Sequence, residues 1–70
     1  MSAKDSIKNV RYKLCMSQKE FGNLVGLTAT SICLYERGEA NPGMRSIRNI
    51  VEKLKTQGIE MKYSDFMDNI

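Results

Sequence analysis

The sequence contains no histidine and no tryptophan, only one proline and only two cysteines. Without histidine, the chain can have neither a histidine general base nor a histidine-ligated metal. Its apolar runs extend over only a few residues, too short for a transmembrane helix or the core of a signal peptide. Cys15 and Cys33 form no Cys-x-x-Cys motif, so we expect two reduced thiols in a cytoplasmic protein; a disulfide is the alternative.

The length and the charge distribution narrow the class of protein. Seventy residues are enough for one small domain, and a hydrophobic content of 41% predicts a packed core. The net charge of +3 is uneven, because residues 1–55 carry ten Lys and Arg against five Asp and Glu, whereas residues 56–70 carry one against three. A basic body of this kind suits a protein that docks on phosphates with one face, and an ordinary Lys-rich surface is the alternative.

Apolar residues recur three and four positions apart along four stretches of the chain, which is the period of an amphipathic helix. We therefore expect an all-α domain of four helices with short connections over residues 1–58. The expected helices cover about 3–15, 17–26, 28–38 and 44–58. Their apolar stripes are Ile7, Val10 and Leu14; Phe21, Leu24 and Val25; Ile32 and Tyr35; and Met44, Ile47, Ile50, Val51 and Leu54.

Capping residues mark the ends of the two central helices. Ser17 and Glu20 have the spacing of a capping box, in which each side chain accepts a hydrogen bond from the backbone of the other. Gly26 suits the left-handed turn that ends a helix, and Thr28 is a competent N-cap for the next one. A steep crossing of two helices also needs a small residue where their backbones approach, and Gly22 meets that need.

Three motifs carry a resemblance to a known family: SQKEFGNLVGLT at 17–28, SICLYERG at 31–38, and the pair Asn41-Pro42. Together they resemble the helix-turn-helix of the phage repressor/Cro family, over about residues 7–54. The resemblance implies a compact four-helix domain that binds double-stranded DNA and regulates transcription, by default as a repressor. It also implies a homodimer on a palindromic operator, with the third helix in the major groove.

The exposed side of the third helix would then face the bases. Steps of 100° per residue place Ile32 and Tyr35 toward the core and another set of side chains on the opposite side. That set has Arg37 at the end of the helix, but it lacks the Gln, Asn or early Arg side chains that read bases bidentately. We therefore expect readout largely through thymine methyl groups, the hydroxyl of Thr30 and DNA shape. An ordinary solvated face is the alternative. The expected base contacts are Ala29, Thr30, Cys33 and Leu34.

Contacts with the DNA backbone are expected at helix ends. Gln18 opens the second helix, where its amide and the backbone N–H groups can meet a phosphate. Lys19, Arg37 and Arg45 are the expected cationic contacts, with a solvated surface charge as the alternative for each. The resemblance also implies a structural ion pair between Arg11 and Glu36. Removal of either partner would leave the other charge unpaired and destabilise the fold.

The C-terminal segment 59–70 has a different period. Apolar and polar residues alternate from Ile59, which is typical of a strand. We therefore expect two chains to pair this segment as an intermolecular β-ribbon, through Ile59, Met61, Tyr63 and Phe66. The alternative is a tail that folds back and covers its own core with Phe66 and Met67.

Two other functions are compatible with the same sequence. One is an antitoxin or a restriction-modification controller, which would use the same DNA-binding domain. The other is a protein-interaction module that kept the fold and lost DNA binding, and the weakly polar face of the third helix favours it. We expect no enzymatic activity, because no residues form a catalytic constellation. We also expect no cofactor, metal, small-molecule ligand or membrane partner.

Overall fold

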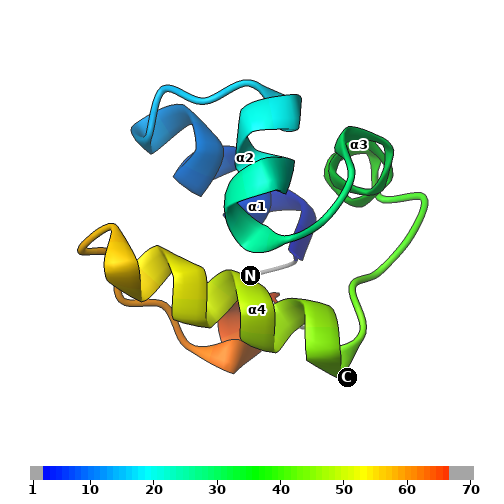
Figure 1. Cartoon of the computed structure of the whole chain (residues 1–70). Helices are drawn as coiled ribbons and strands as arrows, with labels where there is room; N and C mark the ends of the chain where they lie inside the picture. The colour runs from blue at the N-terminus through cyan, green and yellow to red at the C-terminus, as the bar shows by residue number, and fades with distance from the viewer. Residues whose placement is uncertain (1–2, 67–70) are drawn as a thin grey trace.

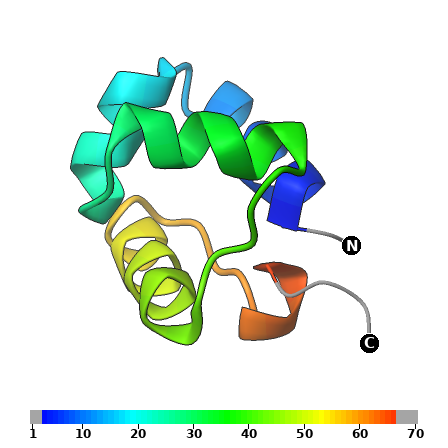
Figure 2. The ribbon, with the colours of Figure 1, turned by 90° about the vertical axis from the view of Figure 1, so that its right-hand side faces the viewer.

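The fold is built from helices throughout the part of the chain that the computed structural model describes, residues 3–66. Four α-helices are followed by one short 3-10 helix, and no strand occurs between residues 3 and 66. Figure 1 shows α2 and α3 above α4, and Figure 2 shows α3 running across the upper half of the molecule with α4 and η1 below it. The elements are α1 (Ala3–Lys13), α2 (Gln18–Val25), α3 (Ala29–Arg37), α4 (Met44–Thr56) and η1 (Tyr63–Phe66).

The predicted apolar stripes meet in one core. Each helix contributes fully or almost fully buried side chains, and Leu14, Leu24 and Tyr35 pack against them from the edge. Met44 is an exception, since it is 55% exposed. It opens α4 one turn before Ile47, where the stripe becomes buried. The core consists of Ile7, Val10, Phe21, Val25, Ile32, Ile47, Ile50, Val51, Leu54 and Phe66.

The predicted caps are confirmed. The Ser17 hydroxyl accepts from the Glu20 N–H at 3.1 Å, and the Glu20 carboxylate accepts from the Ser17 N–H at 2.8 Å. Thr28 caps α3 by accepting from the Ser31 N–H at 3.1 Å. The first helix ends two residues earlier than predicted, because Cys15 adopts a left-handed conformation with φ of 57° and turns the chain toward α2.

The turn between α2 and α3 depends on two glycines. Gly26 has φ of 77°, a conformation that glycine adopts without the steric cost of a Cβ atom. Gly22 is buried, and a Cβ atom added to it would lie 2.7 Å from the carbonyl oxygen of Leu27. The backbone of the turn therefore passes directly over Gly22, and the Leu27 N–H donates to the Gly22 carbonyl at 2.7 Å.

The predicted strand after Gly58 is wrong for the described residues. Ile59 and Met61 pack against the core of their own chain, and Phe66 is fully buried in it. The Ser6 hydroxyl donates to the backbone carbonyl of Asp65, which fastens η1 to α1. The segment runs along its own core, so Ile59 and Met61 turn inward, whereas Tyr63, the next apolar residue of the alternation, is exposed. The fold-back alternative therefore holds for Phe66, while Met67 lies outside the described residues.

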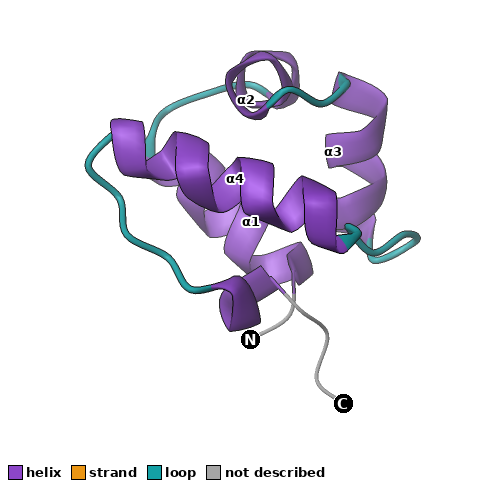
Figure 3. Ribbon diagram, turned by 60° about the horizontal axis from the view of Figure 1, so that its bottom comes forward, coloured by secondary structure: helices purple, strands orange, loops and turns teal. Residues whose placement is uncertain are grey.

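This C-terminal segment completes the domain rather than extending it. η1 contacts both α1 and α4, and α2 contacts both α3 and α4. Figure 3 shows the extended segment running from the end of α4 to η1, below the helices. Residues 59–66 thus belong to the same packed unit as the four α-helices. Along residues 3–66, no helix has the length and apolar character needed to cross a membrane.

Candidate nucleic-acid interface

Two of the four predicted base contacts, Thr30 and Leu34, lie on the outward face of α3. Cys33 lies at the side of the helix, and Ala29 is only about 60° from the buried Ile32. On the inner side, Ile32 is fully buried and Glu36 is 5% exposed. Thr30 and Leu34 lie two residues before and two residues after Ile32, and at 100° per residue each points to the opposite side of the helix. Thr30 is exposed, whereas Ala29, Cys33 and Leu34 are half-buried. The half-buried apolar side chains that pack against the core do not include Leu34. This face is thus not needed to complete the core.

Polar side chains at the start of α3 are already engaged. The Thr28 hydroxyl accepts from the Ser31 N–H and donates to the Ser31 hydroxyl at 3.0 Å. Among the described residues, Thr30 has no side-chain hydrogen bond. A single hydroxyl is therefore the uncommitted hydrogen-bonding group on the outward face of the first turn.

The predicted ion pair between Arg11 and Glu36 joins α1 to α3. Nε of Arg11 donates to Oε2 of Glu36 at 2.7 Å, and Nη2 donates to Oε1 at 2.9 Å. The side chains are only 12% and 4% exposed. The hydrogen bond to Glu36 raises the pKa of Arg11 above its ordinary value. The remaining Nη1 donates to the carbonyl of Met16 at 3.0 Å, so the guanidinium group of Arg11 also holds the α1–α2 connection in place.

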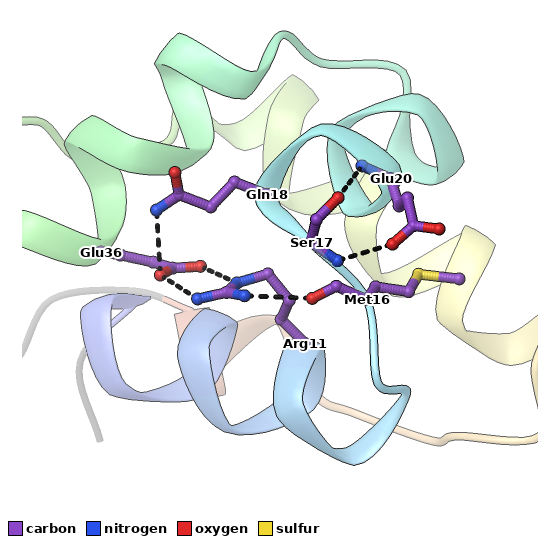
Figure 4. A network of polar contacts seen from close by, with 6 residues as sticks. All are labelled: Arg11, Met16, Ser17, Gln18, Glu20 and Glu36. Carbon is purple, nitrogen blue, oxygen red and sulfur yellow. Dashed lines mark hydrogen bonds and ion pairs between the residues drawn. The ribbon is translucent and has the colours of Figure 1, made fainter.

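Gln18 belongs to the same network, which the sequence did not indicate. Figure 4 shows Gln18 reaching from α2 toward Glu36, and its Nε2 donates to Oε1 of Glu36 at 3.4 Å. A primary amide has two N–H donors on this nitrogen, so one remains for a phosphate. Gln18 therefore occupies the predicted position at the start of α2, but with its orientation fixed by a residue of α3. No local pattern could reveal this contact, since it depends on how two helices pack.

The predicted cationic contacts differ in whether they already form an ion pair within the protein. Lys19 and Arg45 are exposed, and neither makes an ion pair within residues 3–66. Arg37 is exposed at the end of α3, where its Nε lies 2.6 Å from a carboxylate oxygen of Glu39. Figure 2 shows that a loop separates the end of α3 from α4 below it. Arg45 thus lies on a different element from Arg37, and the two do not share one helix face.

The predicted dimer residues are separated by the fold. Phe66 is fully buried and Ile59 and Met61 are half-buried against their own core, so Tyr63, at 37% exposed, is the large side chain that remains outward. Tyr63 lines a shallow groove with Met44, Arg45 and Arg48. Two of the exposed large hydrophobic side chains, Met44 and Tyr63, therefore meet at one place.

The described residues offer no metal site, since no group of three or more acidic or cysteine side chains gathers among them. Cys15 and Cys33 are free thiols, as predicted. Comparison of the chain with protein-family models, curated proteins and solved structures finds no significant match.

Proposed function

We propose that this protein is a sequence-specific double-stranded DNA-binding regulator of the phage repressor/Cro helix-turn-helix type, and by default a repressor. The observation that carries the proposal is the unit of α2, a glycine turn and α3, in which α3 keeps one face out of the core. A helix of this kind fits the major groove of B-DNA. The compact four-helix arrangement also agrees with such a domain.

The surface around α3 favours nucleic acid as the partner that its outward face binds. The excess of ten basic over five acidic residues in 1–55 attracts phosphates. The start of α2 offers backbone N–H groups together with the free N–H of Gln18. Lys19 stands beside it with no acidic partner among the described residues. Phosphates would thus be held next to the bases that α3 reads.

Binding should be tested by selecting bound duplexes from random DNA and titrating the enriched site at two salt concentrations. We expect an enriched motif whose affinity falls steeply between about 50 and 200 mM salt, because phosphate contacts release counterions. Thr30→Glu places a negative charge on the outward face of α3 and should abolish binding. Thr56→Glu, the same change at an exposed threonine at the end of α4, is the matched control. No enriched motif, or equal binding by both variants, would contradict the proposal.

The regulator is proposed to act as a homodimer, because one unit brings a single recognition helix to one half-site. The groove lined by Met44 and Tyr63 is the proposed contact, since it gathers exposed apolar side chains. Met44→Glu and Tyr63→Glu should each give a monomer in sedimentation and bind DNA less tightly, whereas Thr56→Glu should not. A wild-type monomer at concentrations that saturate the operator would exclude this arrangement.

A protein-interaction module is the second candidate. The feature that favours it is the apolar character of three of the predicted base contacts on α3, Ala29, Cys33 and Leu34. Such a module would bind no duplex with salt-dependent affinity, so the same titration separates the two functions. An antitoxin or a restriction-modification controller would instead bind DNA as proposed and differ in genetic context.

A further inference from the structure

We propose that α3 reads the 5-methyl groups of pyrimidines by direct contact, so that its preferred half-site is rich in thymine. This inference rests on the proposed DNA-binding function and assigns the chemical class of base that the site selects. It concerns three of the predicted base contacts on α3, Thr30, Cys33 and Leu34. The class that they select is 5-methylpyrimidine, which includes 5-methylcytosine as well as thymine.

The first supporting observation is the position of Leu34. It points away from the fully buried Ile32, and it is not among the half-buried apolar side chains that pack against the core. Leu34 is half-buried, so part of its side chain stays accessible for contact. Cys33, which is also half-buried, lies beside Thr30 at the edge of the same face. Leu34 and Cys33, together with the methyl group of Thr30, therefore offer van der Waals contact.

The second observation is that nearby hydrogen-bonding groups are engaged within the protein. Thr28 and Ser31 bond to each other, and one N–H of Gln18 is directed to Glu36. At the end of α3, Nε of Arg37 is paired with Glu39. Thr30 is left with one hydroxyl, which cannot form the two parallel hydrogen bonds that identify an adenine or a guanine. On the outward face of the first two turns of α3, direct hydrogen-bond readout is therefore limited to one group.

The chemistry of the major groove supplies the matching partner. Thymine differs from the other bases of DNA in carrying a methyl group on its groove edge, and Ala or Thr methyl groups pack well against it. Leucine and cysteine side chains can form the same kind of apolar contact. Burying one methyl group is worth about a fourfold change in affinity, from the transfer free energy of a CH₂ unit. Several such contacts in a half-site multiply into a clear preference.

The test uses the enriched duplex and changes the methyl groups one at a time. Replacement of a contacted thymine by deoxyuridine removes the methyl group and leaves the hydrogen-bonding edge intact. We expect about fourfold weaker binding for each contacted position. Replacement of the same T·A pair by C·G should also weaken binding, and 5-methylcytosine·G should restore part of the loss relative to C·G.

The protein side of the test uses Leu34→Ala, which shortens the outward side chain without removing a core residue. The ratio of affinities for thymine and deoxyuridine duplexes should fall toward one at the position that Leu34 contacts. Gln57→Ala, which removes an exposed neutral side chain just after α4, should leave that ratio unchanged. Circular dichroism of both variants establishes that they remain folded.

The outcomes separate the two proposals. If the chain enriches a motif but binds deoxyuridine and thymine duplexes equally at every position, methyl readout is wrong and DNA binding stands. The same conclusion follows if 5-methylcytosine binds no better than cytosine. If no duplex shows salt-dependent binding, both the proposed function and this inference are overturned.

Discussion

At the scale of single residues, Glu36 holds three helices together. Its two carboxylate oxygens accept from Nε and Nη2 of Arg11 on α1 and from Nε2 of Gln18 on α2, while Glu36 itself stands on α3. A buried charge is costly unless it is paired and hydrogen-bonded. The same contacts that satisfy Glu36 therefore fix the position of α3 relative to α1 and α2.

Removal of one partner should destabilise the domain strongly. Arg11→Met leaves the buried carboxylate of Glu36 without its partner, and we expect a loss of about 3–5 kcal/mol of unfolding free energy. Arg37→Met breaks an exposed pair, in which the side chains are 64% and 50% exposed, and should cost no more than about 1 kcal/mol. Urea denaturation of both variants provides the measurement. Equal effects would show that Arg11 and Glu36 contribute no more than a surface pair.

The capping box adds a dependence on pH. The hydrogen bond from the Ser17 backbone lowers the pKa of Glu20 below its ordinary value. The pKa of Glu20 is thus lower in the folded protein than in the unfolded chain. The Glu20 carboxylate therefore stabilises the fold at pH values above the unfolded pKa, and this stabilisation is lost as the pH falls through the folded pKa. Glu20→Gln should flatten that acidic part of the stability profile. Thermal denaturation of the wild type and the variant over about pH 2–6 checks it, and parallel profiles would count against the cap.

The residue-scale predictions from sequence succeeded where the signal was local or carried by the family resemblance. The capping box needed only the spacing of Ser17 and Glu20, and the Arg11–Glu36 pair followed from the resemblance. The contact between Gln18 and Glu36 could not be predicted, because it depends on the side-chain orientation that results when α2 and α3 pack. Which residues touch bases or phosphates stays a prediction.

At the scale of elements, the lack of a side chain at Gly22 determines how closely α2 and α3 cross. Any Cβ atom at Gly22 would collide with the backbone of the turn, and backbone cannot rotate aside as a flexible side chain can. The turn could relieve the collision only by moving α3 away from α2. The geometry of the proposed recognition helix is therefore tied to a residue that makes no contact with the groove.

Gly22→Ala tests this relation. We expect a loss of about 1–3 kcal/mol in stability, the usual cost of overpacking, although alanine favours helices. Gly43→Ala is the matched control, because a Cβ atom there meets nothing within 4 Å and its φ is −75°. Chemical denaturation measures both. A Gly22→Ala protein as stable as the control would mean that the turn yields freely.

The segment after Gly58 shows how an apolar period can lead to a wrong prediction. The alternation of residues 59 to 62 reports only that one side of the segment meets an apolar surface. It does not tell whether that surface is a partner strand or the core of the same chain. The four α-helices were predicted correctly because caps and stripes agreed there, whereas after Gly58 no cap or turn signal opposed the strand.

At the scale of the whole molecule, η1 closes the core from the far end of the chain. Phe66 is fully buried between elements that are all complete by residue 56, and Ser6 bonds to Asp65 across 59 positions of sequence. Deletion of the segment after Gly58 would therefore uncover the core. Such a deletion would therefore be a poor test of dimerisation, because loss of folding would obscure any change in the state of association.

Phe66→Ala should therefore cost about 3–5 kcal/mol, as for a large buried aromatic side chain. Tyr63→Ala, one turn earlier on the same short helix, removes an exposed aromatic ring and should cost much less. The comparison is made by urea denaturation at a protein concentration where the state of association is known. If the two variants are equally stable, η1 does not support the core.

The position of Phe66 also has a consequence for synthesis on the ribosome. All four α-helices have left the peptidyl-transferase centre by the time residue 56 is added, but the residue that fills their core comes ten positions later. A nascent chain of α1 to α4 therefore exposes the apolar site that Phe66 occupies in the finished domain. We therefore expect stable folding only after residue 66 has left the exit tunnel, late relative to the translation of the domain.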